Sequence, residues 1–182
     1  MPTVKVSSET RDAILQAASQ IVLTSGTDKL TLEAVAREAG VSKGGLLYHF
    51  PNKEALIAGM ISQIINDLNA KLSLEFNQDR DSDTSKRLLR AYIRANFPCD
   101  RQLVKIGAGL LAAIAVNPNL LQPVRADFDQ IQQKIEESGA DPVVATIIRL
   151  AVDGLWMADM FGLAAPDESS RQKVMEALLA LT

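Results

Sequence analysis

The sequence predicts an all-α protein, and three observations lead to this prediction. Aromatic residues make up only 4% of the 182 residues, while Ala, Leu and Ile are abundant. Apolar residues recur at the spacing of one helix face over most of the chain. No stretch of useful length alternates apolar and polar residues as a half-buried strand does.

Caps and helix-stopping residues divide the chain into about nine helices. A Ser, Thr, Asn or Asp that can accept from the free N–H groups of a first turn precedes most of them. The expected caps are, in chain order, Ser7 or Ser8, Thr31, Ser42, Asn52, Thr84 or Ser85, Asp100, Asp141 and Asp167. Gly26 ends the first helix, Gly40 ends the second, and the polar stretch 78–83 ends the fourth. Asn117-Pro118 separates the sixth helix from the seventh.

Composition and charge exclude several classes of protein. The chain carries 19 basic and 22 acidic residues, so as a whole it lacks the basic character of most nucleic-acid binders. Its longest apolar run, Gly107 to Val116, is shorter than the roughly 18 residues that a membrane-spanning helix needs. Cys99 is the only cysteine, which fits a reducing compartment. We therefore expect a soluble, cytoplasmic protein without a membrane partner.

The sequence also argues against an enzyme. One histidine and one cysteine cannot form a cluster of metal ligands, and no glycine-rich phosphate loop follows a strand. No nucleophile has a plausible general base nearby. We expect no catalytic residue, no metal and no cofactor.

The most informative segment is Thr31 to Lys53, whose sequence is TLEAVAREAGVSKGGLLYHFPNK. Two short helices meet here at a glycine turn. Ala36 is small enough for the helices to cross closely, and Gly40 can take the left-handed conformation that the turn requires. The apolar residues expected to fix the crossing are Val35, Ala39, Val41 and Leu46. This arrangement is typical of a helix-turn-helix, whose second helix enters the DNA major groove.

The charge around the second of these helices supports DNA binding. From Ser42 to Lys53 there are two lysines and no acidic residue, although residues 1–60 carry six basic and six acidic side chains. Phosphate contacts come from basic, hydroxyl and aromatic donors and from backbone N–H groups at helix N-termini. The candidate DNA-binding residues are Thr31, Ser42, Lys43, Gly44, Gly45, Tyr48, His49 and Lys53. His49 could instead serve as a cap or a packing residue, and Phe50 is expected in the core.

These residues resemble the TetR/AcrR family of bacterial transcriptional repressors. The matching positions are Thr31, Val35, Ala36, Ala39 to Ser42, Gly44, Leu46 and His49 to Leu56, with Asp153 to Trp156 similar to a later family pattern. Two positions depart from the family. Leu47 cannot donate to a phosphate, and Gly45 offers no side chain for reading bases, so we expect modest direct readout and more weight on phosphate contacts and DNA shape.

The C-terminal part carries a candidate effector site. Thr146, Arg149, Asp153, Trp156 and Met160 share one face of the eighth helix, and Arg149 can pair with Asp153. This face is either a buried or intersubunit ion pair beside an apolar seam, or the wall of a ligand cavity. The candidate ligand-binding residues are Phe97, Leu110, Phe128, Arg149, Asp153, Trp156, Met157 and Met160. On the sixth helix, Gly107, Gly109, Ala112 and Ala113 permit either close packing or a void.

A second apolar face on the last two helices is the expected dimer interface. It consists of Ala145, Ile148, Val152, Leu155 and Ala158 with Val174, Leu178 and Leu181. The family resemblance implies a homodimer through a four-helix bundle of helices eight and nine. Two-fold symmetry would place two recognition helices roughly 34–36 Å apart on a palindromic operator.

The resulting hypothesis is a homodimeric repressor. Residues 1–52 form a helix-turn-helix DNA-binding domain, and residues 53–182 form a helical effector-binding and dimerisation domain. An unknown small molecule releases the protein from its operator. The alternative is a family member that acts as an activator or has no small-molecule effector.

Overall fold

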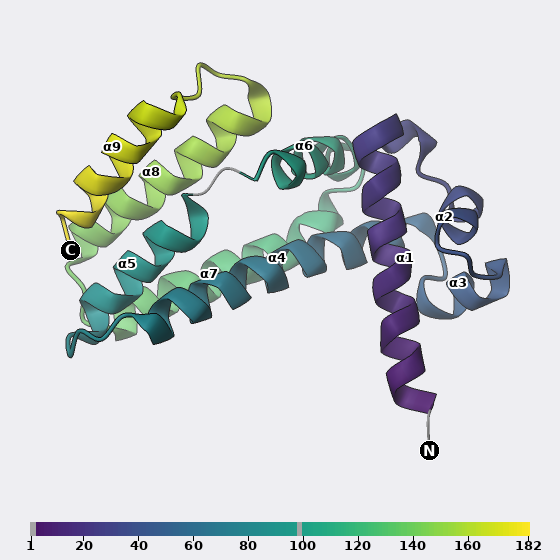
Figure 1. Ribbon diagram of the computed structural model, residues 1–182, viewed down its shortest axis with the longest axis horizontal. Helices are drawn as coiled ribbons and strands as arrows, with labels where there is room; N and C mark the ends of the chain where they lie inside the picture. The colour runs from purple at the N-terminus through teal and green to yellow at the C-terminus, as the bar shows by residue number, and fades with distance from the viewer. Residues whose placement is uncertain (1–2, 98–99) are drawn as a thin grey trace. The chain divides into compact units, whose positions relative to one another are not determined.

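The structure, a computed structural model, describes residues 3–97 and 100–182, and every regular element in these segments is a helix (Figure 1). The α-helices are α1 (Thr3–Ser25), α2 (Leu32–Glu38), α3 (Lys43–His49), α4 (Lys53–Gln78), α5 (Thr84–Asn96), α6 (Arg101–Val116), α7 (Gln122–Glu137), α8 (Pro142–Phe161) and α9 (Glu168–Leu179). Two short 3₁₀ helices, η1 (Thr27–Lys29) and η2 (Pro118–Leu121), precede α2 and α7. The all-α prediction is confirmed. Cys99 lies outside the described residues.

Most of the predicted caps form in the structure. Thr31 Oγ1 accepts from the Ala34 N–H at 3.1 Å, and Ser42 Oγ accepts from the Gly45 N–H at 3.0 Å. Further predicted caps with side-chain hydrogen bonds to the first turn are Asn52, Asp100, Asp141 and Asp167.

Two helix starts differ from the prediction. α1 begins at Thr3, ahead of the expected serine caps, because no glycine or proline interrupts the chain between Thr3 and Ser25. α5 is capped by Asp83 instead of Thr84 or Ser85. The Asp83 carboxylate accepts from the N–H groups of Ser85 and Lys86, so it satisfies two first-turn donors where a hydroxyl usually satisfies one.

The described chain separates into two compact units. The first unit comprises Met1–Ile64 and Lys105–Val124, and the second comprises Ile65–Val104 and Arg125–Thr182. Helices α4, α6 and α7 each contribute residues to both units.

The first unit is built around α1, which packs on α2 and α3. Its fully buried side chains include Ile14, Leu15, Leu30, Val35, Leu46 and Leu56. Burying a side chain of this size contributes about 1.5–3 kcal/mol. In α6, a Cβ at Gly109 would lie 3.0 Å from Val22 and 3.2 Å from Thr27, so at Gly109 the absence of a side chain serves close packing.

In the second unit, α5 packs against α8 and α9 (Figure 1). Its core contains Leu89, Ala91, Ile93, Phe97, Ile131, Ile135, Ala145, Ile148, Val152, Leu155 and Leu178. Ala145, Ile148, Val152, Leu155 and Leu178 were expected at a dimer interface, and that assignment is wrong because the chain buries them in its own core. α8 is apolar on more than one face, and this face is buried within its own chain.

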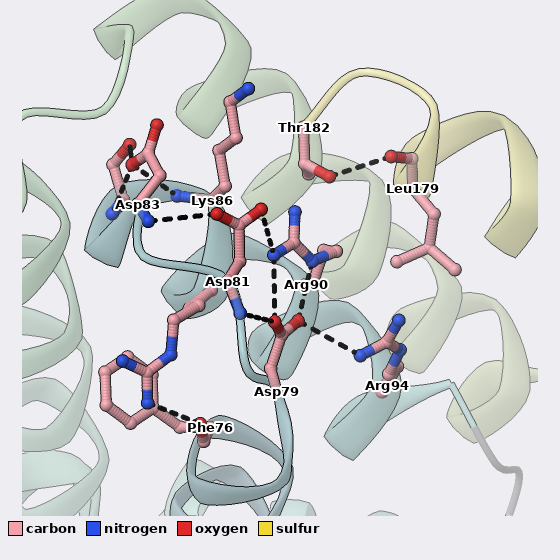
Figure 2. A network of polar contacts seen from close by, with 11 residues as sticks. Phe76, Asp79, Asp81, Asp83, Lys86, Arg90, Arg94, Leu179 and Thr182 are labelled. Atoms are coloured by element: carbon pink, nitrogen blue, oxygen red, sulfur yellow. Dashed lines mark hydrogen bonds and ion pairs between the residues drawn. The ribbon is translucent and has the colours of Figure 1, made fainter.

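The polar residues that follow α4 form a network of ion pairs with α5 (Figure 2). Arg90 donates to Asp79 through Nε at 2.7 Å and through Nη2 at 3.0 Å, and also reaches Asp81 at 3.1 Å. Arg94 adds a contact to Asp79 at 3.3 Å. The Arg90 hydrogen bonds and the N–H of Asp81 hold the pKa of Asp79 well below its usual range. Charge-assisted hydrogen bonds therefore hold the segment that connects α4 and α5 against α5.

Candidate functional site

Helices α2 and α3 meet at a tight turn. Gly40 has a φ of +66°, in the left-handed region that favours glycine, and the Val41 N–H donates to the Ala36 carbonyl at 3.0 Å. Val35 and Leu46 are fully buried beneath the turn. The small and apolar residues of the motif therefore act as the sequence analysis expected, and they fix how α3 leaves the unit.

The outer side of α3 is open to solvent. Tyr48 has 81% of its surface exposed, although large aromatic side chains are usually buried. No atom lies near the position where a Cβ would stand on Gly44, four residues before Tyr48 and hence on the same helix face. This face combines a backbone that another molecule can approach with an exposed phenol donor.

The two capping hydroxyls lie at the N-termini of the same helices. Thr31 and Ser42 are exposed, and each oxygen accepts a cap hydrogen bond. Each hydroxyl still has its own hydrogen to donate. Gly45 is half-buried, and a Cβ there would lie 3.3 Å from Ser42 Oγ, so a side chain at this position would press on the cap.

The end of α3 is fixed by aromatic contacts. His49 is half-buried, with its ring 5.1 Å from that of Tyr48 in an edge-on arrangement. Phe50 is 3% exposed, which confirms its expected place in the core. Arg11 from α1 lies over the Phe50 ring, with its guanidinium carbon 5.3 Å from the ring centroid. Nothing in the sequence points to Arg11, since its contact with Phe50 depends on how α1 crosses α3.

Both lysines among the candidate DNA-binding residues already have partners. Lys43 Nζ lies 2.6 Å from Glu33 Oε1, and this hydrogen bond is the main reason that the pKa of Glu33 is lowered. Lys53 Nζ donates to the backbone carbonyl of Thr27 at 3.4 Å. Neither contact was predicted from the sequence. The only signal for the Lys43–Glu33 contact was that Glu33 lies near the start of α2 while Lys43 begins α3.

The expected pair on α8 forms inside the second unit. Arg149 Nη1 lies 3.3 Å from Asp153 Oδ2, and Tyr92 from α5 donates its hydroxyl to Asp153 Oδ1 at 3.2 Å. Burial, followed by the charge of Asp153, raises the pKa of Tyr92 well above its usual range. Burial also raises the pKa of Asp153. Arg149 Nε is buried without a hydrogen-bond partner. Tyr92 was not predicted from the sequence. The only signal for it was a hydroxyl-bearing side chain on an otherwise apolar face of α5.

The other candidate ligand-binding residues differ in burial and in the unit to which they belong. Phe97 is buried in the second-unit core, and Trp156 is partly buried against that core. Met160 is half-buried, whereas Phe128 and Met157 are exposed. Leu110 is buried and belongs to the first unit.

Among the residues that the structure describes, no group of three or more His, Cys, Asp or Glu side chains is placed to hold a metal ion. No described helix combines the length and apolar character that crossing a bilayer requires.

Family comparisons identify the class of protein. Residues 14–60 match the model for bacterial regulatory proteins of the tetR family, and residues 86–182 match the model for the tetracyclin repressor-like C-terminal domain. The chain belongs to the TetR family. TetR-family proteins are transcriptional regulators that bind DNA and dimerise, and their fold is generally non-enzymatic.

Individual proteins and solved structures are also similar to this chain. Nucleoid occlusion factor SlmA of Vibrio cholerae is 26% identical over 128 residues, which cover 70% of this chain and 65% of that protein. A transcriptional regulator from Rhodococcus sp. Rha1 has a TM-score of 0.74 at 21% identity, over 94% of each chain. The multidrug binding protein EbrR, solved with imidazole, has a TM-score of 0.64 at 26% identity, over 93% of this chain and 89% of the other.

Proposed function

We propose that this TetR-family regulator is a homodimeric repressor that binds a palindromic operator and is released by a small molecule. Residues 1–52 form the DNA-binding domain, and residues 53–182 hold the effector and the dimer interface. The observation that carries the proposal is the exposure of Tyr48 on a helix whose other side is anchored by the fully buried Leu46.

The DNA contacts in this proposal come from α3 and from two helix N-termini. Lys43, Tyr48, His49 and Lys53 would contact phosphates through their side chains. Thr31 and Ser42 would add hydroxyl donors, while Gly44 and Gly45 let the backbone approach the duplex. Phosphate contacts position a protein on DNA without reading sequence, so the operator would be selected largely through its shape.

The dimer interface in this proposal uses the outer stripe of α8. Its exposed apolar residues are Val143, Ile147, Leu150, Met157 and Phe161. Val174 on α9 and Leu181, which follows α9, are exposed as well. The α8 residues are spaced by three, four or seven, which is the a/d pattern of helices that pack in parallel or antiparallel bundles. A stripe of this length is a large exposed apolar patch for a single chain, and a second copy would cover it.

The effector site in this proposal is centred on Tyr92, Arg149 and Asp153. Buried polar groups are normally all hydrogen-bonded, and Arg149 Nε is not. A ligand with a hydrogen-bond acceptor would satisfy this N–H, while the surrounding apolar core would bind the rest of the ligand. EbrR, the multidrug binding protein solved with imidazole, supports a small-molecule role for this chain.

The second candidate function is a family member that acts without a small-molecule effector. It is favoured by the relatives named nucleoid occlusion factors, since that name describes no small molecule. Native mass spectrometry of the protein purified from its own host separates the two candidates. A retained small molecule supports the effector, and an unliganded dimer that still binds and releases DNA supports the second candidate.

The test of DNA binding uses a duplex that the wild-type protein enriches from a random pool. Lys43→Ala and Tyr48→Phe should each weaken binding in a gel shift, because each removes a phosphate donor. Both variants should stay dimeric by size-exclusion chromatography, since both side chains are exposed on α3. Unchanged affinity in both variants would refute the site.

Leu150→Glu tests the dimer separately. A charge on the outer stripe should convert the dimer to monomers and reduce DNA binding, because two recognition helices would no longer be held together. Leu74→Glu is the matched control, since Leu74 has the same 57% exposure as Leu150 but lies on α4. Dissociation by the control alone would contradict the assigned interface.

A further inference from the structure

We propose that Glu33 limits the affinity of this protein for DNA by competing with phosphate for Lys43. The inference rests on the proposed DNA-binding function and adds a residue that opposes binding. Its evidence is the ion pair between α2 and α3, in which Lys43 Nζ lies 2.6 Å from Glu33 Oε1.

The pair joins two exposed side chains. Lys43 keeps 60% of its side-chain surface exposed and Glu33 keeps 64%. Because no packing holds either side chain in place, water or another anion readily replaces Glu33 as the partner of Lys43. A DNA phosphate is such an anion, and Lys43 stands at the first position of α3, beside the open backbone of Gly44.

Glu33 is the acidic residue placed to have this effect. The segment from Ser42 to Lys53 has no acidic side chain, so the carboxylate that faces Lys43 comes from the other helix of the motif. When Lys43 moves to a phosphate, the Glu33 carboxylate loses its partner. It then lies within a Debye length, about 8 Å at physiological salt, of the same phosphate. Both the lost pair and the new repulsion oppose binding.

The pair also changes how binding depends on salt. A lysine that neutralises one phosphate displaces counterions from DNA and contributes about −0.9 to the slope of log K against log[salt]. A lysine already neutralised by a carboxylate contributes less, because its positive charge is partly compensated before DNA arrives. Glu33 therefore makes the slope shallower than the number of lysines at the interface suggests.

The test measures full-length dimer binding to the enriched duplex and to mixed-sequence DNA by fluorescence anisotropy over a range of salt. Glu33→Gln should raise affinity for both DNAs by about two- to five-fold per subunit, the range implied by measured exposed ion pairs. The salt slope should steepen by up to about 0.9 per subunit. Glu33→Asp keeps the charge but shortens the side chain, so its affinity should lie between those of the wild type and Glu33→Gln.

Glu38→Gln is the matched control for net charge. Glu38 lies on the same helix and is exposed, and the described structure shows it in no ion pair. This variant should change affinity less than Glu33→Gln. An equal rise in both variants would overturn the proposal, because net charge alone would then explain the effect.

The Lys43→Ala background separates this inference from the proposed function. In that background Glu33→Gln should lose most of its effect, and an undiminished effect would overturn the proposal. If Lys43→Ala weakens binding and Glu33→Gln leaves it unchanged, the role of Glu33 alone is refuted. If Lys43→Ala binds DNA as well as the wild type, the assignment of Lys43 fails and the inference fails with it.

Discussion

Removing one partner of the ion pair between α8 and α9 should strongly destabilise the second unit. Arg171 Nη2 lies 2.6 Å from Asp159 Oδ1 and 2.8 Å from Oδ2, and the two side chains are 7% and 12% exposed. Asp159→Ala would leave the buried guanidinium of Arg171 without its carboxylate. Breaking a buried pair in this way costs about 3–5 kcal/mol, and the residual exposure of both side chains places the loss near the lower end.

The structure provides a control with the same shortest distance and a different environment. The Lys43–Glu33 pair has the same 2.6 Å distance, but its side chains are 60% and 64% exposed. Glu33→Ala should therefore change stability little, because water screens the charges in both states. The comparison tests burial at one matched charge-to-charge distance.

The assay is thermal unfolding at one fixed protein concentration, because a dimer's Tm depends on concentration. At about 2–4 °C per kcal/mol for a chain of this size, Asp159→Ala should lower Tm by roughly 6–12 °C. The double variant Asp159→Leu with Arg171→Met should recover most of that loss, since apolar residues of similar volume often replace a buried pair. Equal shifts for Asp159→Ala and Glu33→Ala would refute the reasoning.

Three further predictions concern pH and packing. Burial raises the pKa of Tyr92 above the ordinary tyrosine value of about 10, so the folded chain holds the phenol proton more tightly and stability should fall above about pH 10. Tyr92→Phe should reduce that alkaline loss in pH-dependent urea unfolding. Arg90 lowers the pKa of Asp79, so the stability that this carboxylate contributes should be present above about pH 4 and lost at lower pH. The difference in stability between the wild type and Asp79→Asn should therefore close on acidification. A difference that does not depend on pH would contradict this. In α4, a Cβ at Gly59 would lie 2.6 Å from Phe50 Cε1, so Gly59→Ala should lower Tm. The control is Gly154→Ala in α8, where a Cβ would meet no atom within 4 Å. In a monomeric Leu150→Glu background, this control should not lower Tm.

The sequence by itself determined the helices and the local form of the helix-turn-helix. Thr31, Ser42 and Asp141 cap helices as expected, and Gly40 supplies the left-handed turn. These signals act between residues a few positions apart, so they are legible without knowing how the helices pack. The family motif is legible for the same reason, because it lies within one short segment.

Only the tertiary structure decided which faces and which distant residues meet. α8 has apolar residues on two sides, and periodicity could not tell that Ile148 and Val152 face the core while Ile147 and Leu150 face outward. The contact of Tyr92 with Asp153 joins residues from different helices. Such contacts depend on the angle and register at which whole helices pack, and these are set by the sum of many side-chain contacts instead of any local pattern.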